Sequence, residues 1–173
     1  MSGENNKGGG RLSAFMIPLA CAIVLIAADQ ITKALIQSSF AVNESVEVIP
    51  GFFNIVFIMN KGAAFGFLSD VESEWVSWGF TAIAAAAIAV IVVLYRSLGM
   101  GERAARVSLV LIGSGAVGNL IDRIRFGEVT DFLLFYIGKY QWPAFNVADS
   151  CITVGVILLG YSLLARPAMK EDF

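Results

Sequence analysis

Four long apolar stretches constrain this chain more than any other feature of its sequence. They lie at residues 12–36, 76–95, 107–124 and 148–164, and each is close to the roughly 20 residues that an α-helix needs to cross a bilayer. Hydrophobic residues make up 57% of the 173 positions and charged residues only 15%, whereas a soluble domain carries about 25% charged residues. The chain is therefore predicted to be an all-α membrane protein, a bundle of four transmembrane helices.

The positions of lysine and arginine predict the orientation of these helices. Lys7 and Arg11 precede the first stretch, and the short connection between the second and third stretches contains Arg96, Arg103 and Arg106. The long connection between the first and second stretches is acidic and has Lys61 as its one basic residue. Both termini are therefore expected in the cytoplasm, with the two longer connections on the outer side.

The same pattern predicts one domain and two short tails. Residues 1–10 are polar and glycine-rich without apolar periodicity, which indicates a disordered cytoplasmic tail. Residues 11–168 form a single integral-membrane domain, and residues 169–173 form a second cytoplasmic tail. An alternative interpretation of the first stretch is a cleaved signal peptide, because basic residues precede it and small residues follow its apolar centre.

The connection between the first and second stretches is predicted to contain a β-hairpin. Residues 46–49 and 52–58 are rich in β-branched and aromatic residues, and the turn dipeptide Pro50-Gly51 separates them. A two-stranded hairpin is marginally stable by itself, so it should pack on the helices or gain a third strand. We expect a small strand-rich element outside the membrane, which is also compatible with an amphipathic surface anchor.

The residue types exclude several kinds of site. The chain has no histidine, which excludes a Ser-His-Asp or Cys-His site and the usual zinc ligand sets. Cys21 and Cys151 lie in apolar segments and are interpreted as small core residues. No basic stripe or arm indicates nucleic-acid binding. We expect no metal and no cofactor, and a site built from carboxylates remains.

Four carboxylates stand at the ends of the apolar stretches: Asp29, Asp122, Asp131 and Asp149. A charge at a transmembrane helix centre costs about 2.5–3.5 kcal/mol on insertion scales, so a carboxylate at this depth usually marks function. Asp29 and Lys33 are four residues apart and can pair on one helix face. Asp29, Lys33 and Asp122 are therefore expected to form a structural support.

Asp131 and Asp149 could instead work as a pair. Peptide hydrolysis by two carboxylates needs one ionised group, which takes a proton from water, and one protonated group, which donates a hydrogen bond to the carbonyl. Two like charges about 3 Å apart titrate separately, which provides these two states. Asn146 lies three residues before Asp149 and could orient either carboxylate. From these residues alone, two independent structural aspartates explain the pattern equally well.

Small and amide residues near the carboxylates could accommodate a substrate peptide. Gly62 and Gly115 allow close approach of a backbone, and Asn60 offers both a donor and an acceptor. Asn119 and Arg123 are expected to contact the substrate directly. The alternative for these glycines is simple helix packing or a turn.

Five motifs occur in order along nearly the whole chain beyond the first tail. They are Asp29-x-x-Thr32-Lys33, Asn60-x-Gly62-Ala63-Ala64-Phe65, Gly118-Asn119-x-x-Asp122-Arg123, Val129-x-Asp131-Phe132 and Phe145-Asn146-x-Ala148-Asp149. In these motifs and their order the chain resembles the lipoprotein signal peptidases, the signal peptidase II family of bacterial membrane aspartyl endopeptidases. The resemblance implies four membrane spans in the bacterial cytoplasmic membrane, with the active site near the extracytoplasmic face.

The resemblance also implies roles for individual residues. Asp131 and Asp149 would be the catalytic aspartates, with Asp122 supporting them. The substrate site would be shaped by Asn60, Gly115, Asn119, Arg123 and Asn146. The expected substrate is a prolipoprotein with a diacylglyceryl-modified cysteine, cleaved just before that cysteine, and the expected inhibitor is globomycin. Membrane lipid is the other expected partner, and a complete bundle of four helices favours a monomer.

Three rival functions fit parts of the pattern. A small proton-coupled transporter would also use intramembrane carboxylates, although the chain shows no internal repeat. A serine–lysine peptidase would use Ser150 with Lys33 or Lys61. A non-enzymatic anchor protein would use the polar clusters for structure alone.

Overall fold

The computed structural model describes residues 7–62, 74–99 and 101–165 of the chain. The described part contains the helices α1 (Lys7–Ser39), α2 (Glu74–Ser97), α3 (Arg103–Phe126) and α4 (Val147–Leu164). Each of these four is long and apolar enough to cross a membrane. The four predicted apolar spans are therefore confirmed, and each helix extends one or more residues beyond at least one predicted end.

The first helix is longer than predicted. It begins at Lys7, inside the segment that the sequence predicted as a disordered tail, because each residue added to an existing helix gains a backbone hydrogen bond. Residues 1–6 and 166–173, which contain the rest of both predicted tails, lie outside the described residues.

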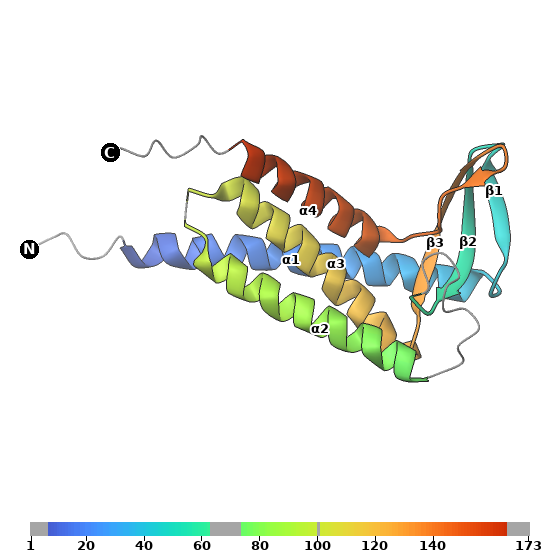
Figure 1. The fold of residues 1–173 in the computed structure, drawn as a ribbon, viewed down its shortest axis with the longest axis horizontal. Helices are drawn as coiled ribbons and strands as arrows, with labels where there is room; N and C mark the ends of the chain where they lie inside the picture. Colours follow the sequence, from blue (N-terminus) through green and yellow to red (C-terminus); the bar gives the residue numbers. More distant parts are fainter. Residues whose placement is uncertain (1–6, 63–73, 100, 166–173) are drawn as a thin grey trace, which may run out of the picture.

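Helix α3 holds the other three helices together, since it contacts α1, α2 and α4 (Figure 1). Small residues allow its close approach to α4, as is common between membrane helices. A Cβ atom added to Gly155 would lie 2.9 Å from the Ser108 carbonyl oxygen, and one added to Gly115 would overlap the Ala148 carbonyl. Gly115 therefore lets α3 pack closely on α4, and its role in shaping the substrate site stays a prediction.

A four-stranded antiparallel sheet lies at one end of the helices (Figure 1). Its strands are β1 (Ser45–Ile49), β2 (Phe53–Asn60), β3 (Val129–Ile137) and β4 (Tyr140–Gln141), in that spatial order. The predicted hairpin is confirmed as β1 and β2, with Gly51 in the left-handed region at the turn (φ 75°). The hairpin gains a third strand, which its marginal stability required.

The origin of this third strand differs from the prediction. The strand-rich element was predicted between the first two helices alone, but β3 and β4 lie between α3 and α4. Residues 129–137 are mostly β-branched, aliphatic or aromatic, and the edge of β2 offers them unpaired backbone groups. Asp131 consequently lies inside a strand, opposite Ile58 of β2, and not at the end of a membrane helix.

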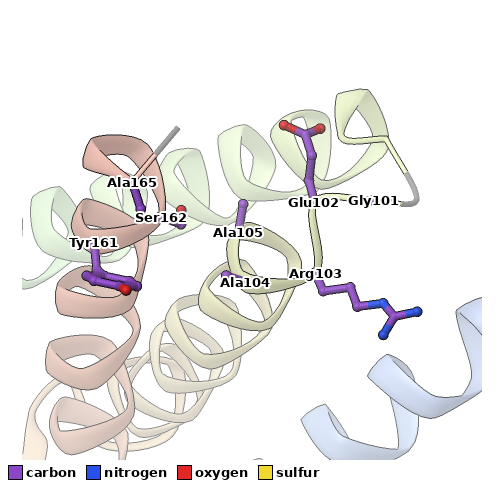
Figure 2. A pocket seen from close by; sticks show the side chains of 8 residues that line it. All are labelled: Gly101, Glu102, Arg103, Ala104, Ala105, Tyr161, Ser162 and Ala165. Atoms are coloured by element: carbon purple, nitrogen blue, oxygen red, sulfur yellow. The ribbon is translucent and has the colours of Figure 1, made fainter. Parts of the chain in front are cut away.

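The sheet is fixed to the helices by a small apolar core. Ile36 of α1, Phe57 of β2 and Phe132 of β3 are buried against one another. The start of α1 and the end of α4 lie at the opposite end of the molecule (Figure 1). A pocket of about 300 Å³ at that far end, between the start of α3 and the end of α4 (Figure 2), includes Arg103 and Tyr161.

Candidate active site

A short connection joins α3 to the strand that bears Asp131. Helix α3 ends at Gly127, which adopts a left-handed conformation (φ 75°) and donates its backbone N–H to the Arg123 carbonyl at 2.9 Å. Strand β3 starts two residues later, at Val129. Glycine relieves the steric cost of this conformation, so the chain turns sharply and places Asp131 near the end of α3.

Lys33 is the centre of a buried ionic network, which we call the support network and which comprises Asp29, Lys33, Asn119 and Asp122. The Lys33 ammonium lies 2.9 Å from Asp29 Oδ2 and 3.1 Å from Asp122 Oδ2. It also donates a 3.0 Å hydrogen bond to Asn119 Oδ1. The predicted pairing of Asp29 with Lys33 is therefore confirmed, and the network ties α1 to α3.

Gln30 and Gly118 complete the contact between α1 and α3. The Gln30 amide donates to Asp122 Oδ1 and to the Gly118 carbonyl, both at 3.1 Å. A Cβ atom on Gly118 would lie 2.6 Å from Asp29 Oδ2. A larger residue at Gly118 would therefore displace the Asp29 carboxylate from Lys33.

The start of α4 is built around a reciprocal cap. Asn146 is the N-cap residue, and its Oδ1 accepts a hydrogen bond from the Asp149 backbone N–H at 2.9 Å. Asp149 Oδ2 in turn accepts from the Asn146 backbone N–H at 3.3 Å. This capping box places the Asp149 carboxylate at the positive end of the helix.

Asn146 also links the two aspartates that the sequence predicts as a pair. Its side chain is fully buried, and Nδ2 donates to Asp131 Oδ1 at 2.7 Å. The same amide nitrogen lies 3.1 Å from Asn119 Oδ1 and 3.2 Å from the Thr130 carbonyl. Asn146 therefore donates to both carboxylates, with its side chain to Asp131 and with its backbone N–H to Asp149, although 17 residues of sequence, including part of β3 and all of β4, lie between them.

Asp131 is held from the other side by Asn60 of β2. The Asn60 amide donates to Asp131 Oδ2 at 2.8 Å, and its own Oδ1 accepts from the Gly62 backbone N–H at 2.8 Å. This second bond fixes the orientation of the Asn60 amide. Gly62 has a φ of +97°, and a Cβ atom there would lie 2.7 Å from the Phe80 ring, so only glycine fits.

The environment of Asp131 favours its protonated form. The pKa of the Asp131 carboxyl is raised to about 7, chiefly by desolvation and also by the negative charge of Asp149. Hydrogen bonds from Asn60 and Asn146 and the positive charge of Lys33 act in the opposite direction. A carboxyl group with a pKa near neutrality can exchange its proton during a reaction.

Arg123 supplies a positive charge next to these carboxylates. Its charge interacts with Asp149, Asp131 and Asp122. Within the part of the chain that the structure describes, its guanidinium makes no hydrogen bond and no ion pair shorter than 4.0 Å. Substrate contact by Arg123 stays a prediction.

Asn119 differs from the expectation of direct substrate contact. Its side chain is buried, its Oδ1 accepts from Lys33 and Asn146, and its Nδ2 donates to Asp149 Oδ1 at 2.7 Å. Because two donors fix the oxygen, the amide nitrogen must face Asp149. The residue thus orients a carboxylate and connects it to the support network.

Sequence reasoning missed three polar residues of this region, Gln30, Gln37 and Thr130. The two glutamines lie in the same polar part of α1 as Asp29 and Lys33, and a polar residue in a membrane helix is itself a signal for a polar contact. Thr130 precedes Asp131 and is fully buried. In the described residues, no group of three or more acidic or cysteine side chains is arranged to hold a metal ion.

Comparison with known proteins identifies the family. Residues 21–165 match the family described as "Signal peptidase (SPase) II". The chain belongs to the signal peptidase II family. A lipoprotein signal peptidase of Cupriavidus taiwanensis is 47% identical over 164 residues, which cover 94% of this chain and 90% of that protein. One from Desulforapulum autotrophicum is 45% identical over 141 residues, covering 82% and 87%.

A solved structure supports the same assignment. It is described as a bacterial membrane enzyme and has a TM-score of 0.79 at 34% identity, covering 92% of this chain and 94% of its own. The resemblance found in the sequence is therefore confirmed. As a family member, the chain is an aspartic peptidase, a membrane hydrolase that removes signal peptides from prolipoproteins. The transporter alternative has no support in these comparisons.

The serine–lysine alternative also lacks structural support. The Ser150 hydroxyl donates to the Asn146 carbonyl at 2.9 Å, and the Lys33 ammonium is surrounded by two carboxylates and one amide oxygen. Both groups are therefore occupied by other partners.

Proposed function

We propose that Asp131 and Asp149 form the catalytic dyad of this peptidase. The proposed reaction is hydrolysis of the peptide bond just before the diacylglyceryl-modified cysteine of a prolipoprotein. The observation that carries the proposal is a pair of linked buried amides: Asn146 donates to Asp131 and to Asn119, and Asn119 donates to Asp149. The matching family motifs contain both aspartates.

The two carboxylates have different surroundings, which suggests different roles. Asp149 accepts hydrogen bonds on both oxygens, lies at the positive end of α4 and is near Arg123. These groups suit the role of a proton acceptor. Asp131 is buried and held by the neutral amides of Asn60 and Asn146, and its burial raises its pKa to about 7.

These two roles, a proton acceptor at Asp149 and a hydrogen-bond donor at Asp131, provide a route for hydrolysis. Asp149 would take a proton from a water molecule as the water oxygen attacks the scissile carbonyl carbon. Asp131 would donate a hydrogen bond to the carbonyl oxygen, which becomes negatively charged. When the C–N bond breaks, a proton passes from the dyad to the leaving amine of the lipidated cysteine, and the signal peptide leaves with a new carboxyl terminus.

Substrate binding would use the groups that surround the dyad. Arg123, whose guanidinium makes no hydrogen bond within the described residues, could bind a substrate carbonyl. Asn60 and Gly62 would shape the site at the end of β2, where the chain approaches α2. The support network would hold the dyad in place without touching the substrate.

We infer that the helices form a single four-helix transmembrane domain in the bacterial cytoplasmic membrane, with both termini cytoplasmic. Arg96, Arg103 and Arg106 lie at the end of the bundle where α1 begins and α4 ends, and such positive charges favour the cytoplasmic side. The sheet and the dyad lie at the other end, which would be extracytoplasmic (Figure 1). Helix α3 contacts the other three helices, and a complete bundle of four helices fits a monomer embedded in lipid.

The first experiment compares purified enzyme on two substrates, a diacylglyceryl-modified prolipoprotein and its unlipidated form. Cleavage just before the cysteine of the lipidated form is expected, with inhibition by globomycin. Asp131→Asn and Asp149→Asn should fold and bind globomycin but lose cleavage, whereas Ser150→Ala should retain it. Near-normal turnover by either aspartate variant would refute the dyad, and equal cleavage of the unlipidated form would refute the lipid requirement.

A further inference from the structure

Thr130 joins the strand that carries Asp131 to the surrounding helices. It has no exposed surface, and each of its polar groups contacts a different element. Its backbone N–H donates to Asp122 Oδ2 of α3 at 3.0 Å, and its carbonyl accepts from the Asn146 side chain at 3.2 Å. The Asp122 oxygen that it contacts is also the oxygen that pairs with Lys33. The residue beside the dyad is therefore attached to the support network.

The Thr130 hydroxyl makes a further contact with α1. Gln37 Nε2 donates to Thr130 Oγ1 at 2.7 Å, and the hydroxyl also lies 3.7 Å from Met59 Sδ of β2. Gln37 is one helical turn beyond Lys33, so both side chains occupy the same face of α1. Helix α1 therefore contacts the Asp131 region twice, through an ion network and through this neutral hydrogen bond.

We propose that Thr130 and Gln37 are positioning residues for the dyad, and that their hydrogen bond sets the place of Asp131 relative to Asp149. Only one peptide bond separates Thr130 from Asp131, so a displacement of Thr130 moves the Asp131 carboxyl directly. Thr130 also shares the Asn146 amide with Asp131. Three acceptors surround that amide, which has two hydrogens, and a shift of Thr130 therefore redistributes its bonds.

This inference rests on the proposed role of Asp131 and Asp149. It adds two residues that do not touch the substrate and that act through the placement of a reacting group. Misplacement of a catalytic group by about 1 Å can lower a rate by up to about 100-fold. The expected effect is on kcat, because neither side chain takes part in substrate binding.

The test is a kinetic comparison of Thr130→Val, Thr130→Ser and Gln37→Leu in detergent-solubilised full-length enzyme on a diacylglyceryl-modified lipobox peptide. Valine keeps the shape of threonine but cannot bond Gln37, whereas serine keeps the hydroxyl. Thr130→Val and Gln37→Leu should each lower kcat by about tenfold with little change in KM. Thr130→Ser should restore most of the rate, and the Thr130→Val/Gln37→Leu double variant should be no slower than the slower single variant.

Ser38→Ala serves as the matched control on α1. Ser38 is exposed and its hydroxyl bonds only to the Leu35 carbonyl of its own helix, so kcat should not change. If Thr130→Val fails to fold, Gln37→Leu, which alters a partly exposed side chain, carries the test alone. Unchanged kcat in Gln37→Leu, or a change confined to KM, overturns the positioning role. Turnover by Asp131→Asn in the same assay would instead overturn the dyad itself.

Discussion

Two groups of buried carboxylates lie side by side in this protein, and they differ in the groups that hold them. Asp29 and Asp122 belong to the support network, where Lys33 lies 2.9 and 3.1 Å from their oxygens. Asp131 and Asp149 form the proposed dyad and make no ion pair shorter than 4.0 Å within the described residues. Neutral amide groups hold them instead.

This difference explains why one group suits structure and the other suits chemistry. A carboxylate next to a buried ammonium group forms an ion pair, and removing either partner would leave an unpaired buried charge. A carboxylate held by amide donors can gain or lose a proton without breaking an ion pair. Burial alone therefore does not distinguish the two groups of aspartates, whereas the charge of their partners does.

Asp131→Asn is expected to have the largest effect and tests whether the two groups of carboxylates differ in function. Cleavage should fall by at least about 10³-fold, because a general acid is lost, while the thermal unfolding temperature changes little. Asp122→Asn should show the opposite pattern, with a clear loss of stability from the support network. Both quantities are measured on the same detergent-solubilised preparations. Similar stability losses in the two variants would contradict the distinction between the groups.

Removal of the Lys33 charge tests the support network directly. Lys33→Met leaves two buried carboxylates without their ammonium partner and should lower the free energy of unfolding by about 3–5 kcal/mol. The double variant Lys33→Met/Asp29→Asn should recover part of this loss, since one unpaired charge is removed. Reversible unfolding in mixed micelles measures both values. A stability equal to that of the wild-type protein would show that the network carries little energy.

The pH dependence of turnover tests the role of Asp131 separately from that of the support network. Because the pKa of Asp131 is raised to about 7 and its protonated form is needed, kcat should fall as pH rises above about 7. Asn60 donates a hydrogen bond that lowers this pKa, so Asn60→Ala should move the alkaline decline to higher pH. A kcat profile measured from pH 5 to 9 tests both points. A decline that moves to lower pH would contradict the role of Asn60.

The smallest effect is expected at the exposed end of the sheet, far from both groups. Tyr136 donates to Glu47 Oε1 at 2.8 Å, and this bond lowers the pKa of Glu47 and raises that of Tyr136. Tyr136→Phe should raise the pKa of Glu47 and leave turnover within about twofold of wild type, because the contact is exposed to solvent. NMR titration of Glu47 measures the first change and the peptide assay the second. A larger loss of turnover would extend the site to this end of the sheet.

The sequence predicted the local parts of this architecture. Span lengths, the hairpin turn at Pro50-Gly51 and the Asp29–Lys33 pair depend on neighbouring residues, and all three are confirmed. The strand β3 carries its own signal in its β-branched and aromatic residues, but the polar motif around Asp131 was interpreted as the end of an apolar stretch. The strand propensity of residues 129–137 was therefore present but received less weight than the polar motif.

The remaining parts depend on contacts between distant residues. The Lys33–Asn119 bond joins residues 86 positions apart, and the Asn60–Asp131 bond joins residues 71 positions apart. No spacing rule reaches across such distances. For this reason Asn119 was predicted as a substrate contact, while its actual neighbours show that it orients Asp149.

The Asp29–Lys33 pair has a consequence for how the protein enters the membrane. Because the two residues are one turn apart on α1, the first helix brings a counter-ion for its own lysine. It can therefore leave the translocation machinery and meet lipid as a nearly neutral unit, before the residues of α3 have been synthesised. Asp122 of α3 is synthesised later and then pairs with an ammonium group that Asp29 already holds in place. The last helices can then pack against a helix whose lysine is already positioned.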